Sequence, residues 1–276
     1  MRSRFFRFMI GATIAALTLW LVPSRSGWTA EKEGKKGKTA KKRGAETKES
    51  GQWKDSFDVD KADLVSTGKN PFFILEPGYV LKFKGKDGDE LVITVLNETK
   101  TVDGVETRVV EERETKNGEL VEVSLNWFAI HKNTGDVYYF GEDSRDYKNG
   151  KVVGQGGSWE SGKSGARFGM MMPGKPTVGQ KYYQEVAPKV AMDRAEHVSV
   201  SETLEVPAGK FENCLKTEES TPLESGKAYK IYAPGVGLLQ DEDFVLVSYG
   251  FEKAKGEKAG KGEAKKAKGG KKSRKE

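Results

Sequence analysis

Residues 54–251 alternate apolar and polar side chains between short turn signals, and this pattern constrains the fold more than any other feature. In YVLKFKGKDGDELVITV (79–95), two alternating segments flank the pair Asp87-Gly88. Asn-Gly and Asp-Gly pairs provide the positive φ values that tight hairpins require. The pattern therefore predicts consecutive antiparallel strands joined by hairpins. Further turn signals lie at VDG (102–104), KNG (116–118), NTGD (133–136), KNG (148–150), PAGK (207–210) and PG (234–235).

These strands are expected to form a single all-β domain, residues 54–251. An antiparallel meander of this length predicts a barrel or a strongly curved open sheet. The chain is long enough to bury a sizeable core without disulfides or metals. One short helix is predicted, at residues 188–194.

The first 30 residues have the layout of a secretory signal peptide. Arg2, Arg4 and Arg7 precede an apolar run at residues 8–22, and Pro23 follows it. The run is shorter than the roughly 20 apolar residues that usually span a membrane, so a cleaved signal is favoured over an uncleaved anchor. No cysteine follows the run, and lipid attachment there is not expected. We therefore predict that the protein is exported.

Two basic arms flank the predicted domain: the linker at 31–53 and the lysine-rich tail at 252–276. Residues 31–50 hold 8 basic and 4 acidic side chains, and the tail holds 11 and 4. Neither can form an apolar core, so both are predicted to be disordered. The whole chain carries a formal charge of +6, whereas residues 51–251 carry −9. We expect the arms to bind an anionic envelope polymer or a membrane surface, with solubility or screening of the acidic domain as alternatives. Because export is predicted, nucleic acid is not an expected partner.

Residue types that carry catalytic or metal chemistry are sparse. Cys214 is the single cysteine and cannot form an internal disulfide. His131 and His197 lie far apart and have no cysteine partners, so a structural zinc site is not expected. The sequence contains no GxSxG nucleophile elbow and no EF-hand calcium loop. We therefore predict no metal site, no cofactor and no catalytic residue.

The stretch GSWESGKS, from Gly157 to Ser164, matches the phosphate-loop pattern GxxxxGK[ST]. A phosphate loop needs a following helix whose N-terminus faces the phosphates. The segment that follows, GARFGMMMPGKP, contains three glycines and two prolines and does not favour a helix. Nucleotide binding is therefore not predicted. We expect this glycine-rich loop to present Trp159 either as a plug in a barrel end or as a lid over a pocket.

Several ordered motifs resemble those of a family of exported bacterial proteins of unassigned function. They are YFGED (139–143), GSWESG (157–162), VGQKYYQE (178–185), VPAGKFENCLKT (206–217) and YAPGVGLL (232–239). The resemblance covers most of residues 68–248 and none of the basic arms. It implies a protein of the bacterial periplasm, cell envelope or extracellular space, with an antiparallel β-fold distantly similar to lipoprotein-carrier sheets. It implies no reaction and no catalytic residues.

Glu196 is the first candidate for a ligand-binding residue. It lies in phase with Val198, Val200, Leu204 and Val206, so the alternation predicts that it faces the apolar interior. A buried carboxylate must be paired, hydrogen-bonded or protonated, and such groups concentrate at functional sites.

Other acids are expected to converge on the same region. Asp193 and Glu185 are close in sequence, and Glu142 and Glu160 lie near turns that would reach the same end of the sheet, beside Trp159. Pairing of these acids with neighbouring lysines and arginines in a purely structural network is the alternative.

The supply of aromatic residues favours an apolar cavity with a few polar groups, which is the usual composition of a small-molecule site. We therefore predict an exported binding protein for a small molecule or lipid. One alternative is a hydrolase of envelope glycans that uses the same carboxylates. Another is a structural envelope protein without a pocket.

Overall fold

The computed structural model describes residues 52–252. The predicted signal peptide and almost all of both basic arms lie outside these residues, so the predictions made for them stay predictions. Within the described part, no helix has the length and apolar character needed to cross a membrane.

The described chain consists of antiparallel strands and two single-turn 3-10 helices, η2 (Lys61–Asp63) and η3 (Lys86–Gly88). In chain order the strands are β1 (Leu64–Val65), β2 (Gly68–Asn70), β3 (Phe73–Leu75), β4 (Tyr79–Lys84), β5 (Glu90–Val102), β6 (Val105–Lys116), β7 (Glu119–His131), β8 (Val137–Lys148), β9 (Lys151–Gly154), β10 (Trp159–Glu160), β11 (Arg167–Met172), β12 (Lys181–Tyr183), β13 (Glu185–Val186), β14 (Arg194–Val206), β15 (Gly209–Ser220), β16 (Ala228–Ala233), β17 (Gly237–Asp241) and β18 (Phe244–Phe251).

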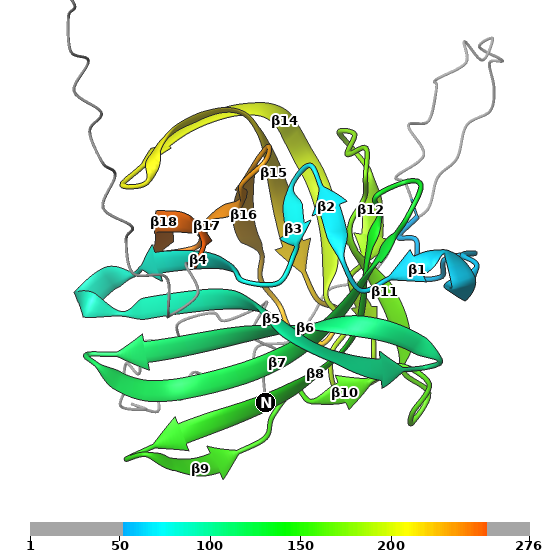
Figure 1. Ribbon diagram of the computed structural model, residues 1–276, viewed down its shortest axis with the longest axis horizontal. Helices are drawn as coiled ribbons and strands as arrows, with labels where there is room; N and C mark the ends of the chain where they lie inside the picture. Colours follow the sequence, from blue (N-terminus) through cyan, green and yellow to red (C-terminus); the bar gives the residue numbers. More distant parts are fainter. Residues whose placement is uncertain (1–51, 253–276) are drawn as a thin grey trace, which may run out of the picture.

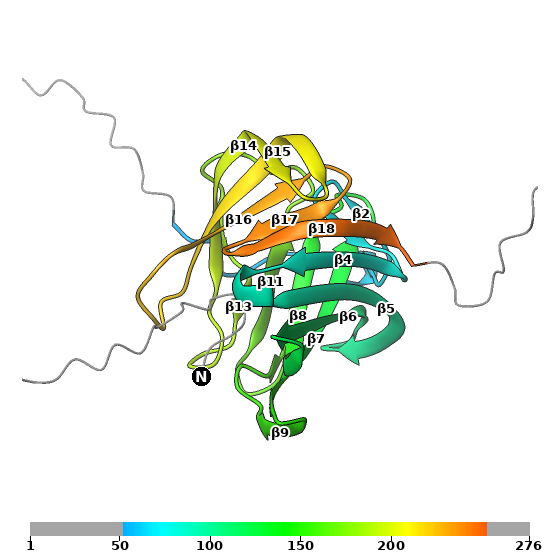
Figure 2. The ribbon, with the colours of Figure 1, turned by 90° about the vertical axis from the view of Figure 1, so that its left-hand side faces the viewer.

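Two meanders make up the main sheet. Each strand from β4 to β8 pairs with the next along the chain, and so does each strand from β14 to β18. The pairing of β18 with β4, between residues far apart in sequence, joins the two series into one curved sheet (Figures 1 and 2). The strands therefore form the antiparallel meander that the alternation predicts.

The sheet closes into a barrel except at one seam. The hydrogen-bonded order of strands around the barrel begins at β12, which pairs with β14, and ends at β13, which pairs with β11 beside β8. In the chain, β12 and β13 are separated by Gln184 alone. At the seam the backbone N–H groups of Gln184 and Glu185 donate to the carbonyl oxygen of Asp193, at 2.7 and 3.4 Å. The predicted all-β barrel is confirmed.

The predicted turns form because their residues accept left-handed backbone conformations. Asp103, Asn117 and Asn149 have φ of 50–51°, and each is followed by a glycine that also has positive φ. Asparagine, aspartate and glycine tolerate this region at little steric cost. These local preferences place the hairpins between β5 and β6, β6 and β7, and β8 and β9.

The helix predicted at residues 188–194 is wrong. This segment is a tight turn in which Ala187 and Ala191 form an isolated antiparallel bridge, and the N–H of Ala187 donates to the carbonyl of Ala191 at 2.7 Å. Lys189 has φ of 67°, a left-handed conformation that a right-handed helix excludes.

One apolar cluster lies inside the barrel, and a second lies mainly on the outer face of β7 and β8. Phe83, Phe128 and Leu215 are among the fully buried members of the inner cluster. The outer cluster contains Trp127 and Phe140 and is partly covered by residues from the N-terminal segment that precedes β2. The barrel therefore packs on both faces of β7 and β8.

A separate hairpin, β2–β3, crosses one end of the barrel. Asn70, which is 1% exposed, holds it there because its Nδ2 donates to the carbonyls of Gly135 and Pro173, at 2.8 and 3.0 Å. On the other side, the N–H of Gly235 donates to the carbonyl of Pro71 at 2.7 Å. The hairpin is thus fastened to both the β7–β8 and the β16–β17 turns.

Candidate functional site

The barrel encloses a cavity of about 390 Å³ beneath the β2–β3 hairpin. Small-molecule sites typically have volumes of about 300–1,000 Å³. The cavity wall combines residues from both meanders and from the hairpin. Its apolar lining is Phe72, Phe73, Ile74, Tyr79, Leu81, Leu91, Ile93, Val95, Val110, Phe128, Met171, Tyr232, Val236, Leu238 and Phe244.

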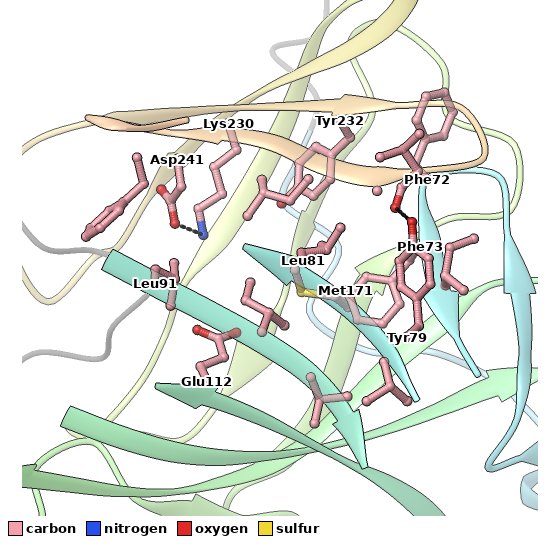
Figure 3. A pocket seen from close by; sticks show the side chains of 18 of the residues that line it. Phe72, Phe73, Tyr79, Leu81, Leu91, Glu112, Met171, Lys230, Tyr232 and Asp241 are labelled. Carbon is pink, nitrogen blue, oxygen red and sulfur yellow. Dashed lines mark hydrogen bonds and ion pairs between the residues drawn. The ribbon is translucent and has the colours of Figure 1, made fainter. Parts of the chain in front are cut away.

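One end of the cavity is aromatic. Phe72 and Phe73 descend from the hairpin, and the Phe73 ring meets that of Phe128 edge-on, with 5.1 Å between the centroids. Tyr79 lies at the same end (Figure 3), where its hydroxyl donates to the carbonyl of Val236 at 2.8 Å. The Tyr79 hydroxyl therefore has its hydrogen-bond acceptor within the cavity wall, and this end of the cavity offers chiefly apolar surface.

The other end is charged, and Lys230 is its central residue (Figure 3). Its ammonium lies 3.1 Å from Glu219 Oε2 and 3.5 Å from Asp241 Oδ2, with only 2% of the side chain exposed. Burial alone would lower the pKa of Lys230, but the carboxylates of Asp241, Glu219 and Glu112 raise it well above its ordinary value. The charged form of Lys230 is therefore strongly favoured.

Acidic residues outnumber basic ones around this end. The charged residues of the lining are Asp89, Glu112, Glu114, Asp241, Glu242 and Asp243, against Lys116 and Lys230. Lys116 Nζ lies 3.6 Å from Asp89, and Lys86, just outside the lining, lies 2.6 Å from Asp243. Glu242 and Asp243 are exposed in the β17–β18 turn, so this end of the cavity meets solvent.

A second hollow, of about 490 Å³, lies between β8, β10 and the turn at 187–191. Three of the predicted site residues line it: Glu142, Trp159 and Glu160. Lys100 Nζ is 3.2 Å from the centroid of the Trp127 ring and 3.0 Å from Glu160 Oε2.

Two neighbouring lysines lower the pKa of the Glu160 carboxyl. Burial alone would raise the pKa of its carboxyl, but hydrogen bonds from Lys163 and Lys100 lower it. Trp159 is 7% exposed and meets Tyr139 edge-on, with 5.2 Å between the ring centroids. It therefore forms a wall between this hollow and the barrel core.

The structure brings Glu142, Glu185 and Asp193 together beneath the hollow, near the seam. All three are nearly fully buried, and the N–H of Asp193 donates to Glu185 Oε1 at 3.4 Å. Burial, followed by repulsion from Asp193 and Glu142, raises the pKa of Glu185 well above its ordinary value. The protonated form of Glu185 is therefore favoured.

The placement predicted for Glu196 is wrong. Its carboxylate lies on the outer face of β14, 3.0 Å from Lys181 Nζ, and Val198 and Val200 beside it are exposed. The inward residues are Ala195 and His197, both at 0% exposure. Register shifts in the pairing of β14 with β15 change which residues face inward, so strict alternation fails along this strand. Glu196 therefore does not join Glu185 and Asp193.

The phosphate-loop match has a different structural context. Within GSWESGKS, Trp159 and Glu160 form the short strand β10, antiparallel to β8, and the chain then turns into strand β11 rather than a helix. Lys163 is 2.7 Å from Glu160. The glycine-rich stretch is thus part of the β-meander.

Residues 52–252 contain no group of three or more histidine, cysteine, aspartate or glutamate side chains that could hold a metal ion. Cys214 is buried and free. His197 is also buried, and its Nε2 lies 2.8 Å from the hydroxyl oxygen of Tyr182.

The sequence analysis predicts an apolar cavity but misses its location and its charged end, although one signal points to them. In AYKIYA (228–233), Lys230 is in phase with Ala228 and Tyr232, and all three are buried. A lysine in an inward apolar row requires compensating carboxylates. The identity of those carboxylates depends on strand pairing.

Comparisons with known proteins show only a distant structural likeness. No protein-family model matches the sequence, and no curated protein matches it. Among solved structures, the chain is similar to a candidate lipoprotein from Parabacteroides distasonis ATCC 8503, with 15% identity and a TM-score of 0.33 over 67% of this chain and 100% of that chain. The family resemblance of the sequence motifs therefore remains a prediction.

Proposed function

We propose that this protein binds a small apolar or amphipathic molecule inside the barrel. The observation that carries the proposal is the cavity of about 390 Å³, which has an apolar wall and a few charged groups at one end. Preformed concave sites of this composition are typical of small-molecule binding. The proposed site lies beneath the β2–β3 hairpin and not at the acids around Glu196.

The N-terminal sequence supports a second part of the proposal, that the protein acts after export. The arginine-rich start, the apolar run at 8–22 and Pro23 have the layout of a signal peptide. The basic arms, 31–50 and 252–276, would then hold the acidic domain near anionic envelope material. No observation favours the hydrolase alternative, because Glu196 faces away from Glu185 and Asp193.

Binding inside the barrel can be tested with N-phenyl-1-naphthylamine, a neutral probe that fluoresces in apolar surroundings. We expect saturable binding to the mature chain, with one probe per protein. Val110→Phe places a larger side chain in the cavity wall and should weaken binding about tenfold or more, since it occupies space that the probe needs. Val95→Phe, on the neighbouring strand, provides an independent test of the same wall.

Val200→Phe is the matched control, because Val200 is 38% exposed on the outer face of β14. It introduces the same side chain away from the cavity and should leave binding unchanged. Circular dichroism would establish that each variant is folded. The proposal fails if the folded mature chain does not bind the probe, or if Val110→Phe, Val95→Phe and Val200→Phe all bind it equally well.

A further inference from the structure

The cavity is divided into an apolar part and an acidic part, and this division carries information about its ligand. Phe72, Phe73 and Tyr79 lie at one end, whereas Glu112, Lys230 and Asp241 lie at the other (Figure 3). An elongated ligand would therefore place its apolar body beneath the β2–β3 hairpin and its terminal group at the charged end.

Three segments that are distant in sequence supply the acids of that end. Asp89 precedes β5, Glu112 and Glu114 belong to the last part of β6, and Asp241 is the last residue of β17. The pairing of β18 with β4 brings these segments together, and the lining as a whole has six acidic and two basic residues. A ligand group at this end consequently meets a negative field.

The charge state of Lys230 reflects that negative field. Its ammonium is almost completely buried, and desolvation opposes its charge. The surrounding carboxylates nevertheless hold the charged form, because Glu219 and Asp241 lie 3.1 and 3.5 Å away. Burial raises the pKa of Glu219, so the negative charge at this end comes chiefly from Asp241 and the other acids of the lining. Lys230 is already compensated and does not provide a strong anchor for an anionic ligand.

We propose that the cavity selects amphiphiles whose polar end is a cationic ammonium group, placed among the acids at the open end of the barrel. This inference rests on the proposed function and specifies its substrate class. Like charges placed together in a partly desolvated site repel each other, so a carboxylate-headed ligand of the same length is disfavoured. A neutral head group should bind with intermediate affinity.

The test compares three ligands with the same chain, decylammonium, decan-1-ol and decanoate, by isothermal titration calorimetry on the mature protein at neutral pH and below micelle formation. We expect decylammonium to bind about tenfold or more tightly than decanoate. The difference should decrease at high salt, because the acids of the β17–β18 turn are exposed and are screened by ions.

The double variant Glu242→Gln/Asp243→Asn removes two exposed acids from the lining and should reduce this selectivity several-fold. The matched control is Glu205→Gln/Glu212→Gln, which removes the same charge from exposed positions on β14 and β15, outside the lining. It should leave selectivity unchanged.

The outcomes separate the two proposals. If decanoate binds as tightly as decylammonium, or more tightly, the cationic preference is refuted while the binding function stands. Equal loss of selectivity in both double variants would also refute it, since the effect would then reflect total charge. If none of the three ligands binds, the cavity is not a binding site and both proposals fail.

Discussion

Acidification should remove the stability that neutral His197, one of only two histidines in the chain, contributes to the folded protein. The ring is fully buried beside Tyr182, and burial lowers the pKa of His197 from 6.5 to about 4. The unfolded chain therefore binds the proton more tightly than the folded chain between these two pH values. The stability contributed by neutral His197 is fully present above pH 6.5 and is lost progressively as the pH falls toward 4.

The magnitude follows from the shift. Each pKa unit corresponds to about 1.4 kcal/mol, so a lowering of about 2.5 units means that His197 contributes roughly 3 kcal/mol less stability at pH 4 than at neutral pH. That is a large share of the roughly 5–15 kcal/mol that stabilises a typical domain. Urea unfolding followed by tryptophan fluorescence at several pH values would measure it.

Two variants isolate the effect. His197→Gln removes the titrating group, so its free energy of unfolding should rise relative to that of the wild type as pH falls from 6.5 to 4, whatever its cost at neutral pH. His131→Gln keeps His197, and the pH dependence of its free energy of unfolding should follow that of the wild type. Because the chain has two histidines, NMR titration of the imidazole signals gives a direct check. A His197 signal that titrates near pH 6.5, or a loss of stability unchanged in His197→Gln, would refute this reasoning.

Two further predictions concern the seam and the tail. The raised pKa of Glu185 means that its own contribution to stability should fall as pH rises above about 4.5, by up to about 1.4 kcal/mol per pH unit until the folded-state carboxyl ionises, which is opposite in sign to the contribution of His197. In urea unfolding experiments, the free energy of unfolding of Glu185→Gln should therefore increase relative to that of the wild type as pH rises. A difference between the two free energies that does not change with pH would contradict this. Deleting residues 253–276 removes most of the tail, which carries 11 basic residues, and should release the exported protein from envelope fractions at moderate salt. Unchanged association would contradict the role proposed for this arm.

The acidic cluster near the seam, which is separate from the proposed binding cavity, was only partly predictable. Glu142, Glu185 and Asp193 were identified as converging residues, and the fold does bring them together. Glu196 was placed on the wrong face, since register shifts between β14 and β15 interrupt the alternation. Such shifts leave little trace in a single sequence, because the residues on both faces of that strand are mixed in polarity.

Local chemistry in the sequence alone determined the all-β architecture and the hairpins. Asp103, Asn117 and Asn149 each precede a glycine, and these pairs accept positive φ regardless of what surrounds them. The excess of acid in residues 51–251 and of base in the arms is likewise a property of composition. Only the tertiary structure decided where the cavity lies and which charges meet inside it. Lys230 finds Glu219 and Asp241, and the β2–β3 hairpin covers the aromatic end, through strand pairings and turn contacts between distant parts of the chain. Those pairings depend on how the whole sheet closes, and this global packing is not encoded in any single stretch of the sequence.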